Sequence, residues 1–162
     1  MQKIWLKIIS IMGGMCGVAN MYLKGEGTPQ NTSAAIAWYE NATVLDSVRA
    51  YNGLGYMYFY GQQVAQNHTK ALQYFVHAAS YENDGDSLFN AAYCLEQGYG
   101  IDVNDASLTA EEIRMMRDKA LQKAVYFYQI AARKLGHFGS IQALGFMHLE
   151  VKDIKYSFEG VM

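Results

Sequence analysis

The sequence is poor in proline, cysteine and charged residues. Its 162 residues include one proline and two cysteines, and only 17% are charged. The 15 acidic and 13 basic residues give a formal net charge of −2. Scarce proline suits a helical chain, because proline interrupts helix interiors. The small negative charge argues against a nucleic-acid-binding surface. Cys16 and Cys94 lie in different segments without metal-ligand spacing, so we expect two small buried side chains.

Long hydrophobic runs are also missing. No stretch reaches the roughly 18 apolar residues that a membrane-spanning helix needs. The first 19 residues have two interpretations. Lysines followed by an apolar run that ends in small residues are typical of a secretory signal peptide. We favour the alternative, in which residues 5–10 resemble residues 38–43 and form the second helix of a preceding repeat. The chain would then begin inside a repeat, as a fragment or a truncated gene model would.

Motifs that carry chemistry are absent as well. The sequence contains no G-x-S-x-G, no Walker loop and no HExxH. His68, His77, His137 and His148 share no metal-ligand spacing. Residues 102–107 resemble the start of a calcium-binding loop, but the later positions of such a loop carry the wrong residues. We therefore predict neither an enzyme nor a site for a metal or cofactor.

What the sequence does contain is a segment that occurs twice, 36 residues apart. Tyr22 and Tyr58 have this offset, as do Gly25 and Gly61. The same offset relates Gln30 to Gln66, Asn31 to Asn67, Ala35 to Ala71, Trp38 to Tyr74, and Ala42 to Ala78. A fixed period of this length indicates a solenoid, in which each unit buries its apolar face against its neighbours.

The clearest copy of the repeat predicts an antiparallel helix pair. Ala50 and Gly55 lie on one face of its first helix and leave room for a neighbouring helix. We expect Tyr58 to fill that space. Gly61 stands where a helix ends with a residue of positive φ. Asn67 is placed to cap the second helix by accepting backbone N–H bonds.

The fold class predicted from these copies is an all-α, right-handed α-solenoid of antiparallel helix pairs. A helical insert lengthens the third copy, with Ser107 or Thr109 as its cap. Within the final partial repeat, residues 139–150 should form a helix whose apolar flank no second helix covers, a candidate homo-oligomer contact. The predicted order is a partial repeat at 1–13, repeats at 14–49, 50–86 and 87–136 with the insert at 106–122, and a partial repeat at 140–162.

Residues 50–79 read A-x3-LG-x2-Y-x2-G-x2-V-x2-N-x2-KA-x2-Y-x3-AA. This pattern resembles the Sel-one-like repeat family, a relative of the tetratricopeptide repeat, whose own period is 34 residues. The resemblance covers roughly residues 5–150 and implies a protein–protein interaction scaffold. Asparagine replaces the family's capping aspartate in every copy.

Within the family, GLGYMYFYG at residues 53–61 looks most like the eukaryotic branch that serves degradation of misfolded proteins in the endoplasmic reticulum. That resemblance implies a lumenal adaptor of a Hrd-type ubiquitin ligase, with ligase subunits, lectins and misfolded glycoproteins as partners. The alternative is a generic cytosolic or bacterial scaffold. A distant third is the secreted branch linked to β-lactams, whose cysteine pair in each repeat this chain lacks.

Three N-x-S/T sequons begin at Asn31, Asn41 and Asn67. Such sequons can accept glycans in a secretory compartment, which would agree with the lumenal interpretation. Asn31 and Asn67 have a competing role as repeat-related helix caps. Asn41 is expected on an outer helix face, so we predict it as the most reliable glycan acceptor.

One column of the first helices is mostly aromatic. It consists of Asn20, Tyr56, Tyr93 and Phe146, with Phe59 and Phe89 beside it. First helices line the concave surface of helix-pair solenoids, so we predict a partner-binding strip. The alternative is packing between adjacent repeats.

Overall fold

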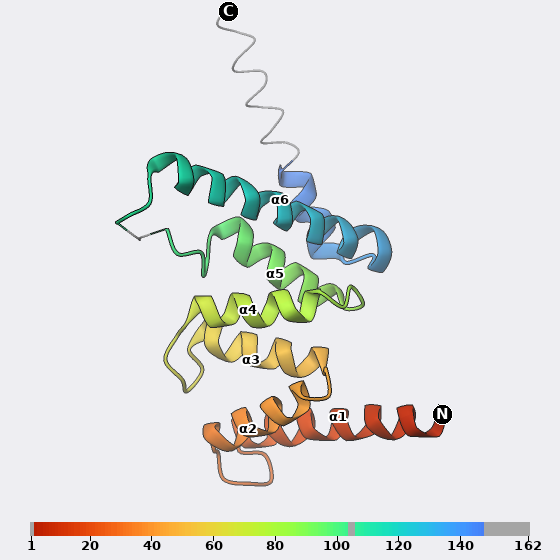
Figure 1. The fold of residues 1–162 in the computed structure, drawn as a ribbon. Helices are drawn as coiled ribbons and strands as arrows, with labels where there is room; N and C mark the ends of the chain where they lie inside the picture. Colours follow the sequence, from red (N-terminus) through yellow and green to blue (C-terminus); the bar gives the residue numbers. More distant parts are fainter. Residues whose placement is uncertain (1, 104–105, 148–162) are drawn as a thin grey trace, which may run out of the picture. The chain divides into compact units, whose positions relative to one another are not determined.

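The computed structural model of the chain describes residues 2–103 and 106–147, with the side chains of residue 11 and of residues 13 onward. The chain divides into two compact units, Met1–Tyr81 and Glu82–Met162. All regular structure in the described residues is helical, and helices adjacent in sequence pack in pairs (Figure 1). This confirms the predicted all-α solenoid class.

The first unit contains two helix pairs. α1 packs against α2, α3 packs against α4, and α2 also contacts α3. Their bounds are α1 (Gln2–Lys24), α2 (Thr32–Thr43), α3 (Val48–Tyr60) and α4 (His68–Ala79).

The predicted caps of this unit are confirmed. The Oδ1 atom of Asn31 accepts a bond from the backbone N of Ala34 at 3.0 Å, and that of Asn67 accepts one from the backbone N of Lys70 at 2.9 Å. Gly61 ends α3 with a left-handed φ of 65°, a conformation that glycine adopts without a Cβ penalty. The two capping asparagines therefore set the same helix start in both pairs.

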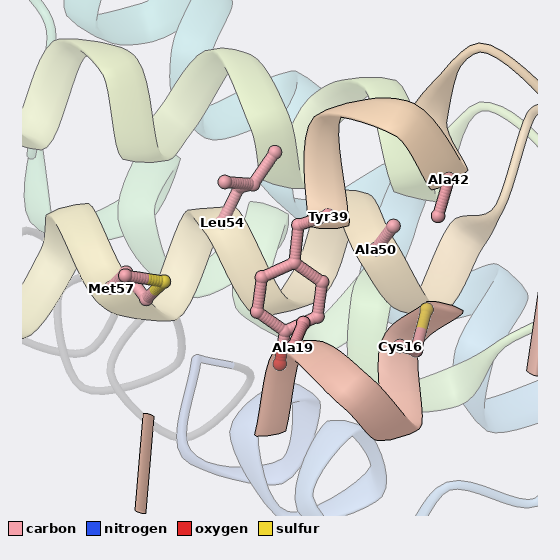
Figure 2. Packing of buried hydrophobic residues seen from close by; sticks show 7 residues of the cluster. All are labelled: Cys16, Ala19, Tyr39, Ala42, Ala50, Leu54 and Met57. Carbon is pink, nitrogen blue, oxygen red and sulfur yellow. The ribbon is translucent and has the colours of Figure 1, made fainter. Parts of the chain in front are cut away.

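The core of the first unit joins α1, α2 and α3. Tyr39 of α2 reaches toward Ala19 of α1, among the other labelled side chains of the core (Figure 2). The seven core residues are all at most 3% exposed. They are Cys16, Ala19, Tyr39, Ala42, Ala50, Leu54 and Met57.

Gly55 is a close-contact position, as predicted, but the ring opposite it is not Tyr58. A Cβ built on Gly55 would lie 2.5 Å from Cε1 of Phe75 in α4. Tyr58 is only half-buried and stacks on Tyr74, with 5.8 Å between ring centroids. The prediction that Tyr58 fills the space was therefore wrong, because helix geometry turns Tyr58 toward the ring of Tyr74.

The N-terminal helix also differs from the prediction. Residues 5–10 were expected to end a preceding repeat before a new one begins at Gly14. α1 instead runs without interruption from Gln2 to Lys24. Gly13 and Gly14 are absent from the residues with positive φ, so the left-handed glycine that ends α3 is not repeated here. The structure contradicts a helix end at this boundary.

The second unit contains α5 (Gly85–Gln97), α6 (Ala110–Leu135) and a further helical segment at residues 138–147. α5 packs against α6. Thr109 caps α6 in a capping box, in which Thr109 Oγ1 accepts from the backbone N of Glu112 and the Glu112 carboxylate accepts from the backbone N of Thr109. Because α6 has no break, residues 110–122 of the expected insert lengthen the second helix, as predicted.

The helix expected at 139–150 is described up to residue 147. Phe138, Ile141 and Phe146 are 71%, 49% and 67% exposed, respectively. Residues 148–150 and the tail at 151–162, including His148, lie outside the described residues. Within the described part of the chain, no helix is long and apolar enough to cross a membrane.

Candidate functional site

Three rings of α3 form an exposed surface, the α3 aromatic patch, made of Tyr56, Phe59 and Tyr60. Tyr56 is 40% exposed and Tyr60 is 59% exposed. Their rings stack almost parallel, with 6° between the planes and 6.0 Å between the centroids. Phe59 meets Tyr60 edge-on at 4.9 Å. Such rings offer a large contact area with little rotamer entropy to lose.

Side chains of α4 support this patch from beneath. The buried ring of Phe75 meets Tyr56 edge-on at 5.5 Å and lies 6.3 Å from Phe59. The His68 ring lies 5.2 Å from Phe59. Tyr60 was not among the predicted site residues. Its position one helical turn after Tyr56 was the available signal, since residues four apart share a helix face.

A related surface lies on the second unit. We define the α5 aromatic patch as Phe89, Tyr93 and Tyr99. Phe89 stacks on Tyr93 at 6.3 Å and 12°, and Tyr99 lies 6.2 Å from Tyr93. Tyr93 is 38% exposed, whereas Phe89 is half-buried between the rings of Tyr128 and His137. Phe89 therefore supports the patch, and Tyr93 presents its exposed ring.

Asn20 has a packing role in the first unit. Its Oδ1 atom accepts a hydrogen bond from the hydroxyl of Tyr39 at 2.9 Å. The equivalent ring in α6, Tyr128, donates its hydroxyl to Glu96 at 2.8 Å. A buried phenol needs such an acceptor. Phe75, the equivalent ring of α4, has no hydroxyl and packs against the aromatic rings of Tyr56 and Phe59.

Phe146, the last predicted member of the column, is exposed on the helical segment at 138–147. The structure thus brings Tyr56 together with Phe59 in the first unit, and Tyr93 together with Phe89 in the second. A single strip through all the predicted positions stays a prediction.

His137, Ser140 and Asp86 superficially resemble a hydrolase triad. Nδ1 of His137 lies 3.0 Å from Ser140 Oγ, and Nε2 lies 3.2 Å from Asp86 Oδ1. However, Ser140 is completely buried, and the backbone N of Ser140 donates to the same Nδ1 at 3.2 Å. This is the geometry of a helix cap, so the arrangement starts the segment at 138–147 and offers no accessible nucleophile.

A charged cluster around Glu82 is also structural. Glu82 accepts hydrogen bonds from the Lys134 ammonium at 2.6 Å and the Tyr126 hydroxyl at 2.8 Å. These bonds, that of Lys134 first, lower the pKa of Glu82. The group ties the start of the second unit to the last turns of α6. No group of three side chains suited to a metal ion occurs in the described ranges.

The three sequons differ in their surroundings. Asn31 and Asn67 are exposed and serve as helix caps. Asn41 is exposed near the end of α2, and the buried residues of that helix are Ala35, Tyr39 and Ala42. The structure therefore places Asn41 on the outer face, as expected.

The repeat, which is visible both in the sequence and in the helix pairs, matches a known family. The Sel1 repeat model matches residues 14–43, 48–80, 85–108 and 116–134. The chain belongs to the Sel1 repeat family. The last two matches fall on the segment predicted as one long third repeat. Sel1 repeats generally act as protein-interaction scaffolds. No curated protein matches the chain.

Two solved bacterial structures share the fold. The Sel1 repeat protein from Oxalobacter formigenes is similar with a TM-score of 0.60 and 21% identity, over 75% of this chain and 43% of that one. The protective antigen c5321 of uropathogenic Escherichia coli strains, which displays an SLR fold, gives 0.53 and 20%, over 76% of this chain and 30% of that one. The chain thus spans less than half the length of either protein.

Proposed function

We propose that this chain is a protein-interaction scaffold that binds its partner through the α3 aromatic patch. The observation that carries the proposal is the exposed, stacked pair of Tyr56 and Tyr60, supported by Phe75. Stacked tyrosines suit recognition, because each ring buries apolar area while its hydroxyl can bond to the partner. The α5 aromatic patch supplies a second surface of the same chemistry.

At a finer level, we infer that the scaffold serves as a lumenal adaptor of a Hrd-type ubiquitin ligase. The sequons support this, above all the exposed Asn41. The partners would be ligase subunits, lectins or misfolded glycoproteins. The alternative, a cytosolic or bacterial scaffold, is favoured by the two bacterial structures with the same fold.

The binding surface can be tested with matched variants. Tyr56→Ser with Tyr60→Ser removes both exposed rings. Val44→Ser serves as the control, since Val44 is 81% exposed and outside the patch. Proteins that co-purify from native cells with the wild type and with Val44→Ser, but not with the double variant, would support the patch as the binding site. Equal recovery with all three chains would refute it.

The compartment requires a separate experiment. Protein isolated from native cells should shift on a gel after glycosidase treatment if it is lumenal, and Asn41→Gln should reduce that shift. A chain without glycans that fractionates with cytosolic proteins would favour the alternative scaffold.

A further inference from the structure

The first ten residues of α6, at 110–119, form helix without a buried side chain. The buried residues of α6 begin only at Ala120. Met115 is 62% exposed and Met116 is 36% exposed. Adjacent exposed methionines are characteristic of adaptable binding surfaces, because the thioether chain is flexible and polarizable. The N-terminal half of α6 therefore exposes two apolar side chains, Met115 and Met116, to solvent.

The methionines belong to a shallow hollow of about 350 Å³, which Leu108, Glu112 and Lys119 also line. The two methionines follow Glu112 by three and four residues and precede Lys119 by four and three. All four side chains therefore share one face of the helix. The apolar residues occupy the middle of this face. A negative charge lies on its N-terminal side, and a positive charge lies on its C-terminal side.

This face is complementary to itself. The midpoint between Glu112 and Lys119 falls between Met115 and Met116. A second copy of the segment, related by a two-fold axis through that midpoint, would run antiparallel. Each Glu112 would then oppose Lys119 of the other copy, and each Met115 would oppose Met116. Both charged pairs are attractive, and the contact uses the same residues on both sides, as in an isologous dimer.

We propose that two copies of this chain associate through antiparallel pairing of residues 112–119. Thr109 supports this geometry, because its backbone N and its hydroxyl bond to Oε2 of Glu112 at 2.8 and 2.7 Å and hold the carboxylate near the helix start. Both bonds use the same carboxylate oxygen. The apolar area is small, so the association is weak and salt-sensitive.

Charge exchange tests the pairing directly by sedimentation equilibrium of the full chain over a range of concentrations. The apparent mass of the wild-type chain should rise toward that of a dimer as its concentration increases. Lys119→Glu alone and Glu112→Lys alone each place like charges opposite one another, and each should weaken association about tenfold. An equimolar mixture of the two variants should form a heterodimer, because each charge again meets its opposite.

Two controls separate pairing from other effects. Glu111→Lys makes the same charge change in the first turn of α6 but has Ala120 opposite it in the proposed pair, so association should persist. Phe146→Ser tests the exposed flank of residues 138–147 and should leave the charge dependence intact. A monomeric wild type, single variants that associate like wild type, or a mixture that stays monomeric would overturn the proposal.

Discussion

Gly55→Ala tests the close approach of α3 and α4. The added Cβ would lie 2.5 Å from Cε1 and 2.6 Å from Cδ1 of Phe75. Phe75 is 2% exposed and packs against Tyr56 and Phe59, so its ring has little room to move. Overpacking of this kind costs about 1–3 kcal/mol. The better helix propensity of alanine offsets about 1 kcal/mol of that cost. We expect a net loss of about 1 kcal/mol in the free energy of unfolding.

Urea unfolding followed by circular dichroism measures this loss. For a slope of about 2 kcal/mol per molar urea, the midpoint should fall by about 0.5 M. Gly17→Ala is the matched control, because nothing lies within 4 Å of a Cβ at that helical position. It should gain about 0.5–1 kcal/mol from helix propensity alone.

Phe75→Leu provides the second half of the experiment. In that background the ring is gone, so Gly55→Ala should become neutral or stabilising, which a double-mutant cycle detects as coupling. If Gly55→Ala raises the midpoint as much as Gly17→Ala does, the contact with Phe75 does not limit the approach of the two helices, and the reasoning is refuted.

Four further outcomes are expected. Asn67→Ala should lower the free energy of unfolding by about 1 kcal/mol in urea titrations, whereas Asn67→Asp should retain most of it, because aspartate also caps helices; equal losses would argue against capping. Mass spectrometry of chain from native cells should find a glycan on Asn41, and an unmodified Asn41 in a cytosolic fraction would contradict the lumenal proposal. Burial raises the pKa of the Cys94 thiol to about 12, so a thiolate-selective reagent near neutral pH should label Cys94 only after denaturation; rapid labelling of the folded chain would show that the site opens. Phe146→Ser should reduce binding of a dye that reports exposed apolar surface, and unchanged fluorescence would mean that the flank at 138–147 is covered.

The repeat period made much of the local structure predictable. Asn31, Asn67 and Gly61 were assigned from sequence to the helix ends that they form. These positions depend on local backbone geometry, which a short segment determines by itself. The start of α6 was predicted at Ser107 or Thr109, and the structure selects Thr109, whose capping box with Glu112 is equally local.

Contacts between distant residues were harder to predict. The period identified Gly55 as a close-contact position but did not show which ring of α4 would face it. Asn20 fits the aromatic column by spacing, yet its role depends on the hydroxyl of Tyr39, which is 19 residues away. The bond between Glu82 and Lys134 spans 52 residues and had no signal in the repeat. These contacts depend on which side chains of two different helices meet, and the spacing of residues along one helix does not predict that.

The hydroxyl bonds beneath the first helices have a consequence for how such repeats can change. Tyr39 and Phe75 occupy equivalent places and differ by one oxygen atom, and the residues above them are Asn20 and Tyr56. Tyr39→Phe would leave Asn20 Oδ1 without its hydroxyl donor, whereas Phe75→Tyr would add a hydroxyl beneath Tyr56 that needs an acceptor, as Tyr128 has in Glu96. A tyrosine at this place is thus tied to an acceptor on the preceding helix, Asn20 for Tyr39 and Glu96 for Tyr128, whereas Phe75 needs none. Transplanting the α3 surface onto the repeat of Tyr39 would therefore require either phenylalanine in place of Tyr39 or a new acceptor for its hydroxyl.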